Sequence, residues 1–178
     1  GFSVGDELPP AWHWMFHHQI ERADNLGIEG HPELGGFMPP VSFNGKTPRR
    51  MWAGGFIEYA RPIRIGDTVE KTSTIKSITP KQGRTGGLCF VVVEHQLSVD
   101  GARCLQEEQT IVYREQSNGS TSGVVQAKPV RADAEFSNQI QPDSIMLFRY
   151  SALTFNAHRI HYDVDFCRNH EGYPDLVV

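Results

Sequence analysis

The chain has 178 residues, of which 39% are hydrophobic, 21% charged and 10% aromatic, and its formal net charge is −4. These values are ordinary for a globular protein and exclude a wholly disordered chain. The acidic balance argues against nonspecific nucleic-acid binding. No apolar window approaches the roughly 18 residues that a membrane-spanning helix needs, and the first residues lack the basic and apolar regions of a signal peptide. Cys89, Cys104 and Cys167 form no C-x-x-C pair, which favours a reducing compartment over a disulfide framework.

The first 55 residues combine aromatic side chains with many glycines and prolines. An aromatic cluster at residues 12–18 is followed by residues 19–24, for which we expect a short helix. Glycine and proline then predict a loop-rich stretch up to residue 40. This segment is too apolar for a disordered tail, so we expect it to wrap over a core.

From Phe56 onwards the pattern is typical of β-structure. Runs rich in β-branched residues occupy residues 56–61, 67–78, 88–99 and 102–114, and turn-like residues separate them. Asp100-Gly101, between the last two runs, is a strong hairpin signal. The pattern predicts a long, curved antiparallel sheet, which needs a helix or a second sheet to cover its apolar face.

Residues 116–128 are rich in serine and glycine and predict a linker. Beyond it, the apolar residues 145–150 predict a strand that opens a second unit. We therefore expect three parts: residues 1–115, the linker 116–128 and residues 129–178.

The residues that follow this predicted strand carry the candidate chemistry. Asn156, His158, His161 and Asp163 lie within eight residues. On a loop that runs into a helical turn, Asn156 and His161 can converge on one cleft. An imidazole exchanges protons near neutral pH, and an asparagine amide can hold a water through its oxygen or polarise a substrate oxygen through its NH₂ group. The alternative is a polar loop whose side chains only satisfy backbone groups.

A metal site is not expected in this segment. His158, His161 and Asp163 superficially suggest one, but their spacing is weak for zinc, and no H-E-x-x-H motif or cysteine set accompanies them. No glycine-rich phosphate loop is present either, so nucleotide binding through such a loop is not expected.

The stretch from Phe148 to Asp163 resembles the signature of MaoC-like, (R)-specific enoyl-thioester hydratases, which have the hotdog fold. The positions that fit the signature are Tyr150, Leu153, Thr154, Ile160 and His161. The positions that depart from it are Phe155 in place of Gly, Asn156 in place of the catalytic Asp, His158 in place of Asn and Arg159 in place of Pro. Strings at residues 12–14, 30–32, 35–40, 49–55 and 107–115 extend the resemblance to most of the chain. They are similar to the branch of fungal-type mitochondrial 3-hydroxyacyl-thioester dehydratases and mesaconyl-CoA hydratase-like proteins.

This resemblance implies an α+β double hotdog, in which each half is a curved antiparallel sheet around a helix. Residues 1–115 would be a degenerate, acyl-binding half, and residues 129–178 would begin a catalytic half that is apparently incomplete. The implied reaction is the reversible hydration of trans-2-enoyl thioesters to (3R)-hydroxyacyl thioesters in fatty-acid or acyl-CoA metabolism. Coenzyme A or an acyl carrier protein would carry the acyl group, without a further cofactor. We expect a homodimer with no nucleic-acid or membrane partner, in the mitochondrial matrix of a eukaryote or the cytoplasm of a bacterium.

In the implied mechanism, Asn156 and His161 occupy the two positions that share a water. Because asparagine cannot act as a base, His161 would transfer the proton while Asn156 orients the water. His158 and Asp163 are alternative bases, although Asp163 is equally a candidate to cap a helix or to orient His161.

Residues of the first part supply candidate substrate contacts. Arg49 and Arg50 would pair with phosphates of the carrier, unless they belong to a solvated turn. Trp12, Trp14 and Trp52 would line an acyl tunnel, unless they are ordinary core residues.

Two other functions remain open at this stage. A hotdog thioesterase would need a carboxylate, for which Glu94, Glu107 and Glu108 are the candidates in predicted strands. A noncatalytic acyl-thioester-binding subunit would fit the asparagine at position 156.

Overall fold

The computed structural model describes residues 1–33, 37, 39–41, 43, 48–83, 86–115 and 133–178. The chain forms two compact units, one from residues 1–19 and 33–117 and the other from residues 20–32 and 118–178. The expected linker at residues 116–128 lies outside the described residues. The division at residues 115 and 129 therefore stays a prediction.

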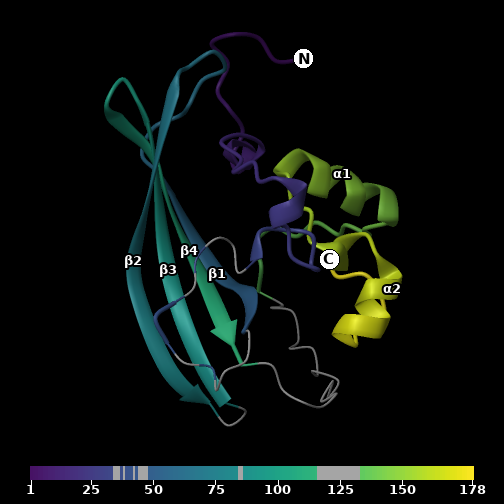
Figure 1. Ribbon diagram of the computed structural model, residues 1–178. Coiled ribbons are helices and arrows are strands. Elements are labelled where there is room, and N and C mark those ends of the chain that lie inside the picture. The colour runs from purple at the N-terminus through teal and green to yellow at the C-terminus, as the bar shows by residue number, and fades with distance from the viewer. Residues whose placement is uncertain (34–36, 38, 42, 44–47, 84–85, 116–132) are drawn as a thin grey trace. The chain divides into compact units, whose positions relative to one another are not determined.

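A four-stranded antiparallel sheet dominates the first unit. The strands are β1 (Arg49–Tyr59), β2 (Val69–Gly83), β3 (Gly86–Val99) and β4 (Ala102–Arg114), in the spatial order β1-β4-β3-β2. Figure 1 shows them side by side as long, curved ribbons. The predicted sheet is confirmed with two differences in its bounds: β1 starts at Arg49 and not at Phe56, and β2 continues to Gly83 and not only to Ile78. A shift in register between Trp52 and Gly54 lets the strand continue through a glycine-rich stretch that weakens the sequence pattern.

Two tight turns set the path between strands. Asp100 and Gly101 both have positive φ, 50° and 73°, as the predicted two-residue hairpin between β3 and β4 requires. Between β1 and β2, the Arg64 N–H donates to the Asp67 carboxylate at 2.7 Å. The Asp67 N–H returns a bond of 3.0 Å to the Arg64 carbonyl. The turn-like separator at residues 64–67 is thus confirmed.

The core of this unit follows the alternation along the strands. One cluster of buried side chains consists of Phe43, Cys89, Val91, Ile111 and Tyr113. A second consists of Ile63, Leu97, Cys104 and Leu105. Because successive strand residues point to opposite faces, alternating positions such as Cys89 and Val91 reach the same core. A 3₁₀ turn, η1 (Trp12–Met15), precedes the sheet in this unit.

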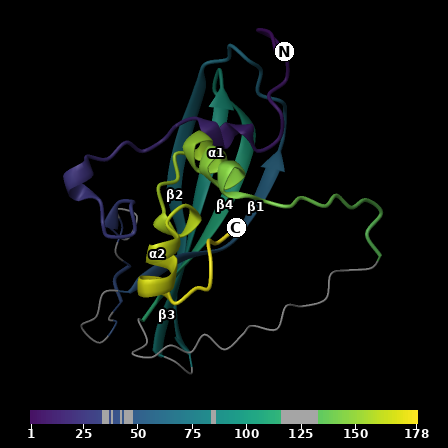
Figure 2. The same ribbon diagram turned by 90° about the vertical axis from the view of Figure 1, so that its right-hand side faces the viewer.

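Short helices make up the described part of the second unit. They are η2 (Ala23–Asn25), α1 (Ser144–Thr154), η4 (Arg159–His161), α2 (Val164–Phe166) and the π-helical turn η5 (Cys167–Glu171). Figure 2 shows α1 and α2 from a second side. Sheet and helices together confirm the α+β class. None of the helices in the described ranges is long and apolar enough to cross a bilayer.

Two secondary-structure predictions are wrong. Residues 145–150 are not a strand but part of α1, which begins where the Asp143 carboxylate accepts the Met146 N–H at 2.8 Å. A side chain at the N-cap accepts a hydrogen bond from a helical N–H that would otherwise lack a partner. The Asp143 cap therefore favours a helix over a strand for the apolar residues 145–150. The helix expected at residues 19–24 is reduced to η2, because Glu21 and Asp24 bind neighbouring groups locally.

Candidate active site

Asn156 follows the end of α1 and is held by a local turn. The helix ends at Phe155, whose φ of 53° is left-handed, and the Asn156 N–H donates to the Ser151 carbonyl at 2.8 Å. The side-chain oxygen Oδ1 accepts the backbone N–H of His158 at 3.1 Å. Because this bond engages the oxygen, the NH₂ group is the part of the amide that remains as a donor for other partners.

His161 has one ring nitrogen committed to the backbone. Its Nδ1 lies 2.8 Å from the carbonyl oxygen of Val177, and the Val177 N–H donates to Ile160 at 2.9 Å. A carbonyl only accepts, so Nδ1 carries the proton, and in the neutral imidazole Nε2 keeps its lone pair. This tautomer is the one that a general base at Nε2 needs.

Two further histidine rings lie next to His161. The rings of His158 and His161 are edge to face with centroids 5.8 Å apart, and His31 meets His158 in the same way at 4.8 Å. Of the residues predicted for catalysis, the structure therefore places His158 against His161, and Asn156 is joined to the backbone of His158.

The sequence interpretation missed His31 and its neighbour Glu29. His31 Nε2 lies 3.4 Å from the Glu29 carboxylate, and both side chains are half-buried. Their loop lies close to residues 156–161 because Gly30, at φ 95°, has no Cβ that would overlap the carbonyl oxygen of Ala157. The Gly30-His31-Pro32 motif contributed to the family resemblance, but nothing in the sequence assigned it a chemical role.

Asp163 is engaged by its neighbours. One carboxylate oxygen accepts the Phe166 N–H at 2.9 Å, which caps α2, and the other accepts the Arg159 guanidinium at 2.6 and 3.0 Å. The Phe166 N–H, followed by Arg159, lowers the pKa of Asp163 below its usual value. These contacts favour the structural role among the two that the sequence left open.

Glu29, His31 and His158 also have the ligand types of a metal site. Among the residues that the structure describes, their ligand atoms lie within 4.8 Å of one another. Two imidazoles and a carboxylate suit a divalent transition metal. The Glu29 carboxylate is already paired with His31 at 3.4 Å, and the absence of a metal stays a prediction.

In the first unit, η1 is anchored to β4 through Glu107. The two carboxylate oxygens bind Trp14 Nε1 at 3.0 Å and His13 Nε2 at 3.2 Å. Burial acts to raise the pKa of Glu107, but the hydrogen bonds from His13 and Trp14 outweigh it and lower that pKa. The Glu107 carboxylate therefore fastens η1 to β4, and the Trp14 indole takes part through its N–H group.

The other predicted substrate contacts are spread over the same unit. Arg49 and Arg50 are half-buried successive residues of β1, so their side chains leave opposite faces of the strand. Trp52, also on β1, is 68% exposed, whereas Trp12 packs edge-on against Phe2 at 5.1 Å. Their roles toward a substrate stay predictions.

The three glutamates considered for a thioesterase also have partners. Lys76 bridges the carboxylates of Glu94 and Glu108 across neighbouring strands. With Glu107 bound to His13 and Trp14, each of the three glutamates has a cationic or hydrogen-bonding partner.

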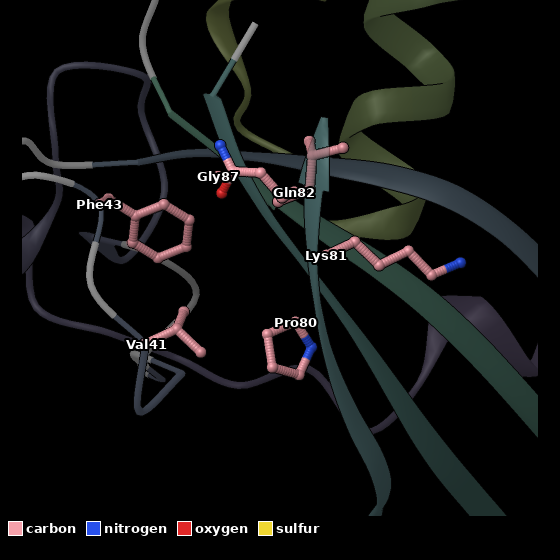
Figure 3. A pocket seen from close by; sticks show the side chains of 7 residues that line it. Val41, Phe43, Pro80, Lys81, Gln82 and Gly87 are labelled. Carbon is pink, nitrogen blue, oxygen red and sulfur yellow. The ribbon is translucent and has the colours of Figure 1, made fainter. Parts of the chain in front are cut away.

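A cavity of about 390 Å³ lies beside the β2–β3 hairpin. Figure 3 shows Val41 and Phe43 facing Pro80 across it, while the Lys81 side chain extends away. Lys81 Nζ instead lies over the Phe90 ring, 5.0 Å from its centroid. None of the three tryptophans expected to form an acyl tunnel lines this cavity.

Known proteins share the fold. A crystal structure of HtdX from Mycobacterium tuberculosis superimposes with a TM-score of 0.55 at 18% identity, over 82% of this chain and 51% of that one. A second HtdX crystal structure gives 0.52 at 19% identity, over 72% and 49%. This likeness supports the predicted hotdog fold, while a double hotdog with an incomplete second half stays a prediction.

Sequence relatives cover almost all of this chain. Mesaconyl-C(4)-CoA hydratase of Chloroflexus aurantiacus is 44% identical over 176 residues, 99% of this chain and 61% of the relative. The mitochondrial hydroxyacyl-thioester dehydratase type 2 of Schizosaccharomyces pombe is 27% identical over 192 residues, 96% of this chain and 62% of the relative. The chain thus spans about three fifths of the length of these relatives. The family model for hydroxyacyl-thioester dehydratase type 2 matches residues 11–178, so this chain belongs to that family.

Proposed function

We propose that the protein is a hydro-lyase that interconverts trans-2-enoyl thioesters and (3R)-hydroxyacyl thioesters. The observation that carries the proposal is the bond from His161 Nδ1 to the Val177 carbonyl, 2.8 Å long, which leaves Nε2 as a proton acceptor. Membership of the dehydratase family and the hydratase named among the relatives support the same reaction.

In the hydration direction, His161 Nε2 takes a proton from a water whose oxygen receives a hydrogen bond from the Asn156 NH₂ group. The water oxygen bonds to Cβ, and the electron pair of the double bond moves to Cα. The proton is then delivered to Cα, so that one water is added in total. General acid–base catalysis of this kind contributes about 10² to 10⁴ in rate.

We propose a coenzyme A thioester as the first substrate to test, with acyl carrier protein as the alternative carrier. The support is the name of the relative that is 44% identical, which acts on mesaconyl-C(4)-CoA. The protein would work as a homodimer, in the mitochondrial matrix of a eukaryote or the cytoplasm of a bacterium. Sedimentation of the full-length protein tests the dimer.

The decisive experiment compares wild-type protein with His161→Ala on mesaconyl-C(4)-CoA and crotonyl-CoA, followed by the loss of enoyl-thioester absorbance. Turnover by the wild type and a loss of about 100-fold or more in the variant is the expected result. Equal turnover by both proteins would reject His161 as the base. Binding of both thioesters without turnover by folded wild-type protein would favour a noncatalytic acyl-binding subunit.

A further inference from the structure

Three histidine rings of the candidate site lie next to one another in a row. The centroids of His31 and His158 are 4.8 Å apart, and those of His158 and His161 are 5.8 Å apart. Both contacts are edge to face, the favourable arrangement for neighbouring aromatic rings. The ring of His158 therefore stands between those of His31 and His161 and contacts both.

The His31 ring has an oxygen acceptor near each nitrogen. Nδ1 lies 3.2 Å from the Pro32 carbonyl oxygen, and Nε2 lies 3.4 Å from the Glu29 carboxylate. A neutral imidazole has a single N–H, and with that proton on Nε2 the contact with the Glu29 carboxylate opposes rotation of the ring about its Cβ–Cγ bond. The side chains of His31 and Glu29 are only 19% and 26% exposed, so water competes less for these contacts than at an open surface.

Backbone groups of the loop that carries Glu29 and His31 also attach it to the segment that carries His158. The Arg159 N–H donates to the Glu29 carbonyl at 2.9 Å. The Arg159 guanidinium also donates to the Ile28 carbonyl at 3.3 Å. Substitution of either side chain therefore leaves these loop contacts in place and isolates any effect on the histidine row.

We propose that His31, fixed by Glu29, is a positioning residue for the hydration reaction: it acts through His158 to hold the His161 ring with Nε2 directed at the reacting water. Its kinetic consequence rests on the function proposed above, whereas the coupling between the rings does not. The hydrogen-bonding partners that orient metal-binding histidines change affinity or activity by about 10- to 100-fold, which gives a scale for a positioning residue.

The kinetic test measures kcat and KM of the full-length protein for the enoyl thioester that the wild type hydrates. His31→Ala is expected to lower kcat about 10-fold, with KM changed less than about 2-fold. Glu29→Ala is expected to lower kcat less, and Glu29→Gln to recover part of the loss because its amide oxygen still accepts from His31. Glu21→Ala, which removes an exposed carboxylate of the same unit, is the matched control and leaves kcat unchanged. A wild-type kcat in His31→Ala overturns the proposal.

A second measurement separates this proposal from the proposed function. Nitrogen-15 resonances of the imidazoles report the tautomer and environment of His161 whether or not turnover occurs. We expect them to shift in His31→Ala and to stay unchanged in Glu21→Ala. Unchanged His161 resonances in His31→Ala overturn the proposal even if the enzyme is active. Loss of activity on chelation, restored by Zn²⁺, also overturns it, because the same side chains would then act as metal ligands.

Discussion

The ring of His161 is linked to the backbone of Val177 by a hydrogen bond of 2.8 Å from Nδ1 to the carbonyl oxygen. Residues near the end of the described chain thereby determine the tautomer of the candidate base. The Val177 N–H in turn donates to the Ile160 carbonyl at 2.9 Å, which stabilises the loop that carries His161. Two backbone groups of one residue thus position both the ring and its loop.

Substitution of Asn156 tests how the local turn contributes to stability. Asn156→Ala removes the acceptor for the His158 N–H and is expected to lower the free energy of unfolding by about 1 kcal/mol. Asn156→Asp keeps an oxygen acceptor and is expected to unfold like the wild type. Urea unfolding measures the stability of the three proteins. Equal stability of all three proteins would contradict the assigned turn.

Gly30 is expected to be irreplaceable for steric reasons. A Cβ at this position overlaps the carbonyl oxygen of Ala157, in addition to the cost of a positive φ for alanine. We expect Gly30→Ala to destabilise the protein by more than about 2 kcal/mol, which exceeds the 1–2 kcal/mol of the backbone conformation alone. Gly172→Ala is the matched control, because Gly172 has φ 72° but nothing within 4 Å of the added atom. Thermal unfolding measures the stability of both variants. An equal loss in Gly30→Ala and Gly172→Ala would contradict the expected clash with Ala157.

Glu107 is expected to stabilise the attachment of η1 to the sheet. Glu107→Gln removes the charge that binds His13 and Trp14 and is expected to cost about 1–3 kcal/mol. Glu108→Gln, on the adjacent residue and the opposite face of β4, removes a more exposed ion pair to Lys76 and is expected to change stability by less than about 1 kcal/mol. Unfolding followed by tryptophan fluorescence measures both. A larger loss in the second variant would refute the anchor.

Asp163 is expected to give the protein a distinct acid sensitivity. Its pKa in the folded state lies below the unfolded value because the Phe166 N–H and Arg159 stabilise the carboxylate. The unfolded chain therefore binds more protons at acidic pH. The stabilisation is complete above the unfolded pKa of about 4 and is lost as pH falls through the folded pKa.

The unfolding midpoint of the wild type in urea should accordingly fall with pH more steeply than that of Asp163→Asn. Asp165→Asn, which changes an exposed carboxylate of the same turn, should keep the wild-type slope. Identical slopes for wild type and Asp163→Asn would show that the ion pair and cap do not contribute.

Much of the sheet could be predicted because its signals are local. Runs of β-branched residues and the Asp100-Gly101 turn predicted the later strands, and β4 has the expected limits. The prediction of a strand at residues 145–150 was wrong because the pattern of a short apolar segment does not distinguish a strand from a buried helix. The cap formed by Asp143 and the length of the helix resolve that ambiguity.

The antiparallel hairpins of β2, β3 and β4, the closeness of Asn156, His158 and His161 in the chain, and the family resemblance could be predicted from the sequence, because each depends on neighbouring residues or on whole motifs. The pairing of β1 with β4, the contact of His31 with His158, the bond from His161 to Val177, and the binding of His13 and Trp14 by Glu107 emerge only from the three-dimensional structure. These contacts join residues far apart in sequence, and no periodicity or spacing encodes them. They depend on how loops fold back, which a single glycine such as Gly30 permits by its lack of a side chain.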